Sequence, residues 1–178
     1  MDDTICCSCN PKDVLEKVIG RVWTIKKGSI YPSNIYLCNK VSKVSLEKGI
    51  NCWTFSSAQY AHTAVNNVER YLIALNQSLP KKASDPFKID YRPEIDISTI
   101  LLQSEANYFQ SLIEILRLIV ELGRIDITVE VSMMFSMMAM PQKCHLKQLL
   151  HIFAYLKQKY NSETALDPTV PVFDEALF

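Results

Sequence analysis

The stretch Y-F-Q-S-L-I-E-I-L-R-L-I-V-E-L-G-R-I-D-I-T-V-E-V-S, residues 108–132, decides how the second half of the chain folds. Its first part places apolar residues three or four positions apart, which is the period of one helix face. The spacing predicts a helix over residues 105–122. The part that follows is apolar nearly all round, so we expect a second, buried helix over residues 125–140 that Pro141 ends. The face of the first helix is formed by Tyr108, Leu112, Ile115, Ile119 and Leu122.

Residues 143–160 continue the helical pattern, with apolar positions such as Leu146 and Phe153 on one side and lysines on the other. These residues complete a three-helix C-terminal unit over residues 104–160. Methionines are concentrated in the middle helix, where we interpret them as buried filler; an adaptable partner groove is the alternative. They stand at positions 133, 134, 137, 138 and 140.

The first half of the chain alternates between apolar and polar residues in two runs, residues 35–46 and 50–55. Glu47, Lys48 and Gly49 between them are turn residues, so the pattern predicts a β-hairpin. A helix is expected from Ser56 or Ser57 to about residue 76. Upstream, residues 4–9 are typical of a short strand, and residues 13–25 of a helix that Asn10 and Pro11 begin.

These elements predict an α+β fold in which a hairpin region is followed by a three-helix unit. We divide the chain into residues 1–79, a proline-containing linker at 80–103, the helical unit at 104–160 and an acidic tail at 161–178. The linker carries Pro80, Pro86 and Pro93 and shows little periodicity.

Composition sets further bounds on the function. The 178 residues carry a formal net charge of zero, which exerts no overall pull towards nucleic acid or an anionic membrane. Residues 12–48 nevertheless hold eight basic residues against three acids. One C-x-x-C spacing joins Cys6 to Cys9, but no second cysteine pair follows downstream to complete a four-ligand metal site. The N-terminus has no signal-peptide pattern, and no apolar run is long enough to cross a bilayer. We therefore expect an intracellular protein of the cytoplasm or nucleus, without a membrane partner.

An ordered series of residues in the second half resembles the C-terminal part of the reverse transcriptase of copia-type LTR retrotransposons. In that family a tyrosine-led helix precedes an Arg-x-Asp turn, a buried helix and a proline, and a histidine then leads a helix that ends in Tyr-Leu-Lys. The hairpin followed by a helix containing Gln59 and Tyr60 also fits the family. The matching positions of the series are Tyr108, Arg124, Asp126, Pro141, His145 and Tyr155-Leu156-Lys157.

The resemblance also gives a meaning to the two acids that follow Met1. Reverse transcriptases carry Tyr-x-Asp-Asp on a hairpin of the palm, and Met1-Asp2-Asp3 fits its last three positions. Nucleotide addition uses two Mg²⁺ ions, which prefer oxygen ligands. By resemblance, Asp2 is the direct metal ligand and Asp3 the more peripheral one, because neighbouring side chains on a strand point to opposite faces. Mg²⁺ is thus the implied cofactor.

The implied protein is a partial polymerase palm and thumb whose family activity is RNA-directed DNA polymerisation on a template–primer. The nucleotide-gripping fingers and the first palm aspartate of the family have no counterpart in the sequence. We therefore expect the chain to be a fragment that is inactive alone, completed by the remaining polymerase portion as a partner. Cys38 and Glu114 stand where the family pattern leads us to expect glycine. A glutamate within a helix–helix contact must be exposed or paired.

Several residues keep two interpretations at this stage. Lys26, Lys27, Lys40 and Lys43 either contact the backbone of the template–primer or form a solvated face. Trp23 and Trp53 either stack on bases or pack in the core, which is the commoner use. Arg124 and Asp126 suggest a structural ion pair or cap, and His145 suggests a capping or packing residue. For the whole chain, a non-enzymatic helical interaction module and a gene relic that folds in part are the alternatives.

Overall fold

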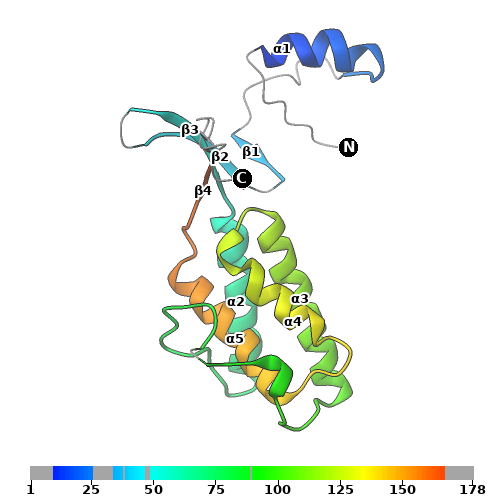
Figure 1. Cartoon of the computed structure of the whole chain (residues 1–178), viewed down its shortest axis with the longest axis vertical. Helices are drawn as coiled ribbons and strands as arrows, with labels where there is room; N and C mark the ends of the chain where they lie inside the picture. The colour runs from blue at the N-terminus through cyan, green and yellow to red at the C-terminus, as the bar shows by residue number, and fades with distance from the viewer. Residues whose placement is uncertain (1–9, 26–33, 38, 47–48, 89, 167–178) are drawn as a thin grey trace, which may run out of the picture.

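The structure, a computed structural model, describes residues 10–25, 34–37, 39–46, 49–88 and 90–166. It consists of a helical bundle with an antiparallel sheet at one end, and an N-terminal helical segment beyond the sheet (Figure 1). The chain is therefore a mixed α+β protein, as the sequence predicts. Within the described residues, no helix combines the length and the hydropathy that crossing a bilayer requires.

The sheet has four strands in the order β1-β2-β3-β4, and all neighbours are antiparallel. The predicted hairpin is confirmed: β2 (Asn39–Ser45) pairs with β3 (Asn51–Ser56), and Lys43 lies opposite Trp53. The short β1 (Ile35–Tyr36) forms one edge. β4 (Thr164–Leu166), which lies within the segment expected as a tail, pairs with β3 at the other edge. The end of the helical unit is thereby tied to the sheet.

The bundle consists of α2 (Ala58–Ala74), α3 (Gln103–Glu121), α4 (Thr128–Ser136) and α5 (Lys143–Gln158). α2 follows β3 directly and packs against α5 and α3, so all these helices contribute to one hydrophobic core. The predictions of α2, α3 and α5 are confirmed to within a few residues at each end. The centre of the core is filled by fully buried side chains, among them Phe109, Leu116, Ile119, Met134, Ile152 and Phe153.

Two of the helices end in the same backbone motif. After α3, Gly123 has a φ of 103° and donates its N–H to the Val120 carbonyl at 2.9 Å. The next residue, Arg124, donates its N–H to the Ile119 carbonyl at 3.2 Å. This pair of bonds is the Schellman arrangement, in which the left-handed residue is normally glycine. It turns the chain sharply and sets Arg124 at the corner between α3 and the following helix. Asn76, with a φ of 55°, ends α2 in the same way.

The prediction of one long, fully buried helix over residues 125–140 is wrong. The segment begins with a 3₁₀ turn (Ile125–Ile127), and α4 ends at Ser136. Only Val131 and Met134 are buried within α4, while Val129 is 66% exposed. The helix packs chiefly against α3, so its other side faces solvent despite its apolar residues.

The N-terminal segment is a continuous helical stretch made of α1 (Pro11–Asp13), a π-helical turn (Val14–Val18) and a 3₁₀ turn (Ile19–Arg21). Asn10 begins it, as predicted, by accepting the N–H of Asp13 at 3.5 Å. The helix ends near residue 21, four residues earlier than expected. None of its residues is buried, and Val18 and Val22 are largely exposed. The apolar stripe of this helix is therefore only partly covered, with Val14, Leu15 and Ile19 half-buried.

Candidate functional site

The acids that the resemblance assigns to magnesium, Asp2 and Asp3, lie outside the described residues, as do Lys26 and Lys27. Within the part of the chain that the structure describes, no group of three or more His, Cys, Asp or Glu side chains is arranged to hold a metal ion. The magnesium site thus stays a prediction that rests on Asp2 and Asp3.

The two predicted nucleic-acid-binding lysines that the structure describes lie on opposite faces of the sheet. Both are exposed on β2, but they are three residues apart, and side chains of a strand alternate between its faces. Lys40 lies opposite Ser56 on β3, and Lys43 lies opposite Trp53. The structure therefore does not bring Lys40 and Lys43 together, and a nucleic acid bound to one face would meet one of them.

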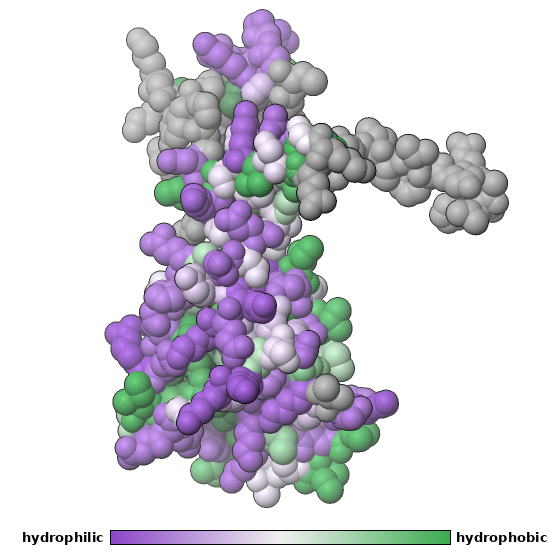
Figure 2. All heavy atoms as spheres, turned by 90° about the vertical axis from the view of Figure 1, so that its left-hand side faces the viewer, coloured by the Kyte–Doolittle hydropathy of each residue, from purple (hydrophilic) through white to green (hydrophobic). Residues whose placement is uncertain are grey.

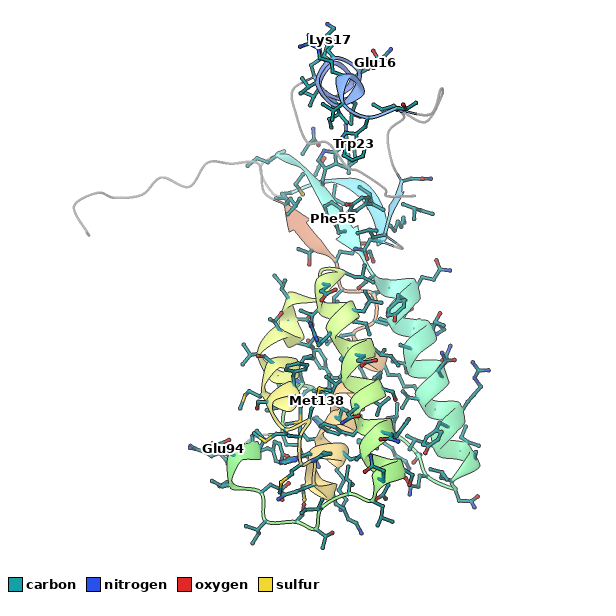
Figure 3. The ribbon with its side chains drawn as sticks, turned by 90° about the vertical axis from the view of Figure 1, so that its right-hand side faces the viewer. Glu16, Lys17, Trp23, Phe55, Glu94 and Met138 are labelled. Carbon is teal, nitrogen blue, oxygen red and sulfur yellow. The ribbon has the colours of Figure 1, made fainter. Side chains whose placement is uncertain are left out.

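The face that carries Lys43 is both basic and aromatic. The ammonium group of Lys43 lies 4.7 Å from the centre of the Trp53 ring, a cation–π contact. Trp53 is 40% exposed, and Leu166 lies opposite it on β4. Phe55, labelled on the sheet in Figure 3, is two residues from Trp53 on β3 and therefore belongs to the same face. The interpretation of the two tryptophans as core residues is wrong, because Trp53 and Trp23 are both exposed, Trp23 by 71%.

Arg124 is the most buried of the lysine and arginine side chains that form ion pairs among the described residues. Its guanidinium, 2% exposed, donates to both carboxylate oxygens of Asp126: Nε to Oδ1 at 2.8 Å and Nη2 to Oδ2 at 2.7 Å. The Tyr155 hydroxyl on α5 donates to the same carboxylate at 3.0 Å. The Thr164 hydroxyl, at the start of β4, donates to the Gly123 carbonyl. This group, which we call the Arg124 corner, joins α3, the turn before α4, α5 and β4, and it confirms the predicted structural ion pair.

The electrostatics of the Arg124 corner favour the ionised carboxylate. Partial burial raises the pKa of Asp126, but the hydrogen bonds and the charge of Arg124 outweigh this effect, so the pKa of Asp126 lies below its usual value. Burial, followed by the bond to Asp126, raises the pKa of the Tyr155 hydroxyl. The phenol therefore remains a proton donor to a charged acceptor over the ordinary pH range.

A cavity of about 470 Å³ opens beside the Arg124 corner. Lys159 and Glu163 line it together with Arg124 and Asp126, so the opposite charges balance and the cavity concentrates neither anions nor cations. The Nη1 atom of Arg124 is buried and has no hydrogen-bond partner within the described protein, but its burial keeps it from the cavity surface. The arrangement is that of a structural junction rather than a reaction centre.

His145 forms a second polar junction at the other end of the helical unit. Its Nδ1 accepts the backbone N–H of Gln142 at 3.0 Å, which caps the start of α5. Its Nε2 donates to the Pro93 carbonyl at 3.1 Å and lies 3.7 Å from the Asp96 carboxylate. The ring is only 3% exposed. The prediction that His145 caps or packs is confirmed.

The structure also locates the residues that depart from the family pattern. Glu114 is exposed on α3, so it carries no burial penalty and does not disturb the helix contact. Cys38 lies outside the described residues. Sequence reasoning missed two buried polar residues of α5, Gln148 and His151. The signal that could have revealed them is their spacing: with His145, they recur every three residues on a helix whose other buried positions are apolar.

Comparison of this chain with protein-family models, with curated proteins and with solved structures finds no match.

Proposed function

We propose that the chain is the C-terminal portion of a copia-type reverse transcriptase, namely the end of the palm followed by the thumb and connection region. The proposal is supported by the positions of the residues that resemble the family, because they form the polar junctions of the helical unit. Arg124, Asp126 and Tyr155 build one polar junction, and His145 builds the other. Buried polar groups need partners of fixed type and geometry, so residues at such junctions tolerate few replacements. The series is thus the part of the helical unit that a family would share.

The chemistry of the proposed polymerase divides between this chain and the rest of the enzyme. Two-metal phosphoryl transfer needs several carboxylates that converge on Mg²⁺, and Asp2 and Asp3 would supply two of them. A further carboxylate would come from the remaining polymerase portion, since the described residues hold no metal-ligand group. The role of these 178 residues is then support and contact with the template–primer, in the cytoplasm or nucleus.

The sheet face of Lys43 and Trp53 is the part of the described surface that suits a template–primer. A lysine can neutralise a phosphate, and an exposed tryptophan can stack on a base or a sugar. Lys43 and Trp53 lie opposite each other and are both exposed, so one strand of nucleic acid could reach both. Lys26 and Lys27 are the further candidates from the sequence.

Primer extension tests whether the chain binds a template–primer but does not polymerise by itself. The purified chain is incubated with an RNA template, a DNA primer, deoxynucleotides and Mg²⁺, beside a complete reverse transcriptase as positive control. We expect no incorporation by the chain alone, together with co-elution of the chain and the hybrid in low-salt gel filtration. Incorporation would overturn the claim that these residues do not polymerise alone, and failure to co-elute would count against the polymerase surface.

A non-enzymatic interaction module is the second candidate, and the apolar side of α4 favours it. Phe135 is 44% exposed under the guanidinium of Arg117, 4.8 Å above the ring, beside a cavity of about 250 Å³ between α3 and α4. Another face of the bundle is largely hydrophilic, with its hydrophobic residues in separate groups (Figure 2). If the chain does not co-elute with the hybrid but self-associates stably in the same gel filtration, the interaction module is favoured.

A further inference from the structure

The linker expected between the two halves of the chain is docked along α5. We call residues 80–88 and 90–98 the proline strap. Three polar side chains of α5 donate to its backbone: His145 to the Pro93 carbonyl, Gln148 to the Pro86 carbonyl and His151 to the Asp85 carbonyl, each at 3.1 Å. All three side chains are at least nine-tenths buried. They follow one another at three-residue intervals, so they form one row on the helix.

The proline strap covers part of the core. Ala83 and Pro93 of the strap are themselves buried, and its Phe87 and Tyr91 pack against the core cluster. Glu94, by contrast, lies at the outer end of the bundle and is exposed (Figure 3). Burial of the Tyr91 hydroxyl, followed by the charge of Asp96, raises its pKa. Undocking the strap would therefore expose apolar surface as well as break the row of hydrogen bonds.

The hydrogen bonds of the strap fix which ring nitrogen of each histidine carries a hydrogen. A carbonyl oxygen only accepts, so the Nε2 atom of each ring carries the hydrogen. In the neutral ring, Nδ1 is then an acceptor. The Nδ1 atom of His145 is used by Gln142, whereas the Nδ1 atom of His151 is buried and has no hydrogen-bond partner among the described residues. A second proton on His151 would create a buried N–H without an acceptor.

The histidines at the two ends of the proline strap differ in their surroundings. His145 uses both ring nitrogens, Nδ1 towards Gln142 and Nε2 towards Pro93, and the Asp96 carboxylate lies 3.7 Å from Nε2. The charged groups that act on His151 are Asp85 and Lys88, which oppose each other. Burial of His151 is the larger effect and lowers its pKa below the usual value. The first half of the strap thus depends on a histidine that stays neutral.

We propose that residues 80–88 form an acid-released clasp: protonation of His151 undocks them from α5, while residues 92–98 remain held by His145. The sign follows from linkage. Because the docked ring has the lower pKa, docking is complete above the usual pKa of histidine and is lost as the pH falls through the lowered value. One proton can weaken docking by at most about tenfold for each pH unit.

Hydrogen–deuterium exchange of the whole chain at pH 7.5 and pH 5.5 tests this proposal. Rates are divided by the intrinsic rates at each pH to give protection factors. We expect protection of peptides from residues 80–88 to fall several-fold at pH 5.5, and protection of residues 92–98 to change less than twofold. No loss in residues 80–88, or an equal loss in both halves, would overturn the clasp.

Two histidine variants isolate the titrating group. His151→Gln keeps an amide donor for the Asp85 carbonyl but does not titrate, so protection of residues 80–88 should become independent of pH. His62→Gln is the matched control, because His62 is exposed on α2, and it should respond as the parent does. A pH response of His151→Gln equal to that of the parent would contradict the proposal. NMR titration of His151 in the parent gives a second test, which requires a pKa below the usual value for histidine.

Discussion

At the scale of single residues, the Arg124 corner decides how the helical unit is held together. A buried guanidinium is tolerated only when its charge and its N–H groups are matched, and Asp126 meets both needs through two hydrogen bonds. The carboxylate is in turn oriented by Tyr155, from a helix 29 positions later in the sequence. Loss of the carboxylate should therefore matter much more than loss of the phenol.

Two substitutions separate these contributions. Asp126→Asn leaves the buried charge of Arg124 unmatched, and we expect the free energy of unfolding to fall by about 2–3 kcal/mol, less than for a fully buried pair because Asp126 is a third exposed. Tyr155→Phe removes one hydrogen bond and should lower it by about 1 kcal/mol. Urea unfolding followed by circular dichroism measures both. If both variants lower the free energy of unfolding equally, the charge of Asp126 adds no stability beyond that of one hydrogen bond.

The pH dependence of stability follows from the same carboxylate. Because the folded pKa of Asp126 lies below its unfolded value near 3.9, its contribution is complete above about pH 4 and is lost as the pH falls through the folded pKa. Thermal unfolding between pH 2 and pH 6 should therefore show a steeper decline below pH 4 for the parent than for Asp126→Asn. Parallel curves would contradict the assignment.

At this scale, the contacts of a residue could be predicted when its partner is close in the sequence. Arg124 and Asp126 are two residues apart, and His145 follows Pro141, so their pairing and capping roles could be predicted. The bonds from Tyr155 to Asp126 and from His151 to Asp85 join residues 29 and 66 positions apart, which no local pattern specifies.

At the scale of elements, the turn after α3 depends on Gly123. Its φ of 103° is a conformation that L side chains rarely adopt, whereas a Cβ would make only an ordinary van der Waals contact with Thr164 at 3.6 Å. Gly123→Ala should therefore lower the free energy of unfolding by about 1–3 kcal/mol. Gly20→Ala is the matched control, since Gly20 lies in the N-terminal segment, whose residues are not buried. If Gly20→Ala lowered the free energy of unfolding as much as Gly123→Ala, this account of the turn would be contradicted.

The elements differed in how well their sequences specified them. The hairpin, α2, α3 and α5 have clear periods and sharp ends, and the predictions of all four are confirmed. The burial of α4 was predicted wrongly because apolar residues occur on all its sides, whereas the helix packs chiefly against α3. β4 is three residues long and exists through pairing with β3, so it leaves no periodic signal of its own.

At the scale of the whole molecule, the fold class was predictable, but the arrangement of the candidate nucleic-acid-binding residues was not. Lys40 and Lys43 are close in the sequence and were predicted as one basic group. A count of charges along the sequence does not take into account that side chains of a strand alternate between its two faces. The pairing of β2 with β3 places them on opposite faces. The proposed function thus makes a sharper claim than the sequence did: Lys43, beside Trp53, contacts the template–primer, and Lys40 does not.

The salt dependence of hybrid binding tests this claim most directly. The affinity of the chain for a labelled RNA–DNA hybrid is measured by fluorescence anisotropy at several salt concentrations, for the parent, Lys43→Gln and Lys40→Gln. We expect the affinity to fall as salt rises, and the slope to decrease by about 0.9 for Lys43→Gln but to stay unchanged for Lys40→Gln. No salt-dependent binding by the parent would contradict the polymerase assignment, and equal slopes for all three proteins would contradict the role of Lys43.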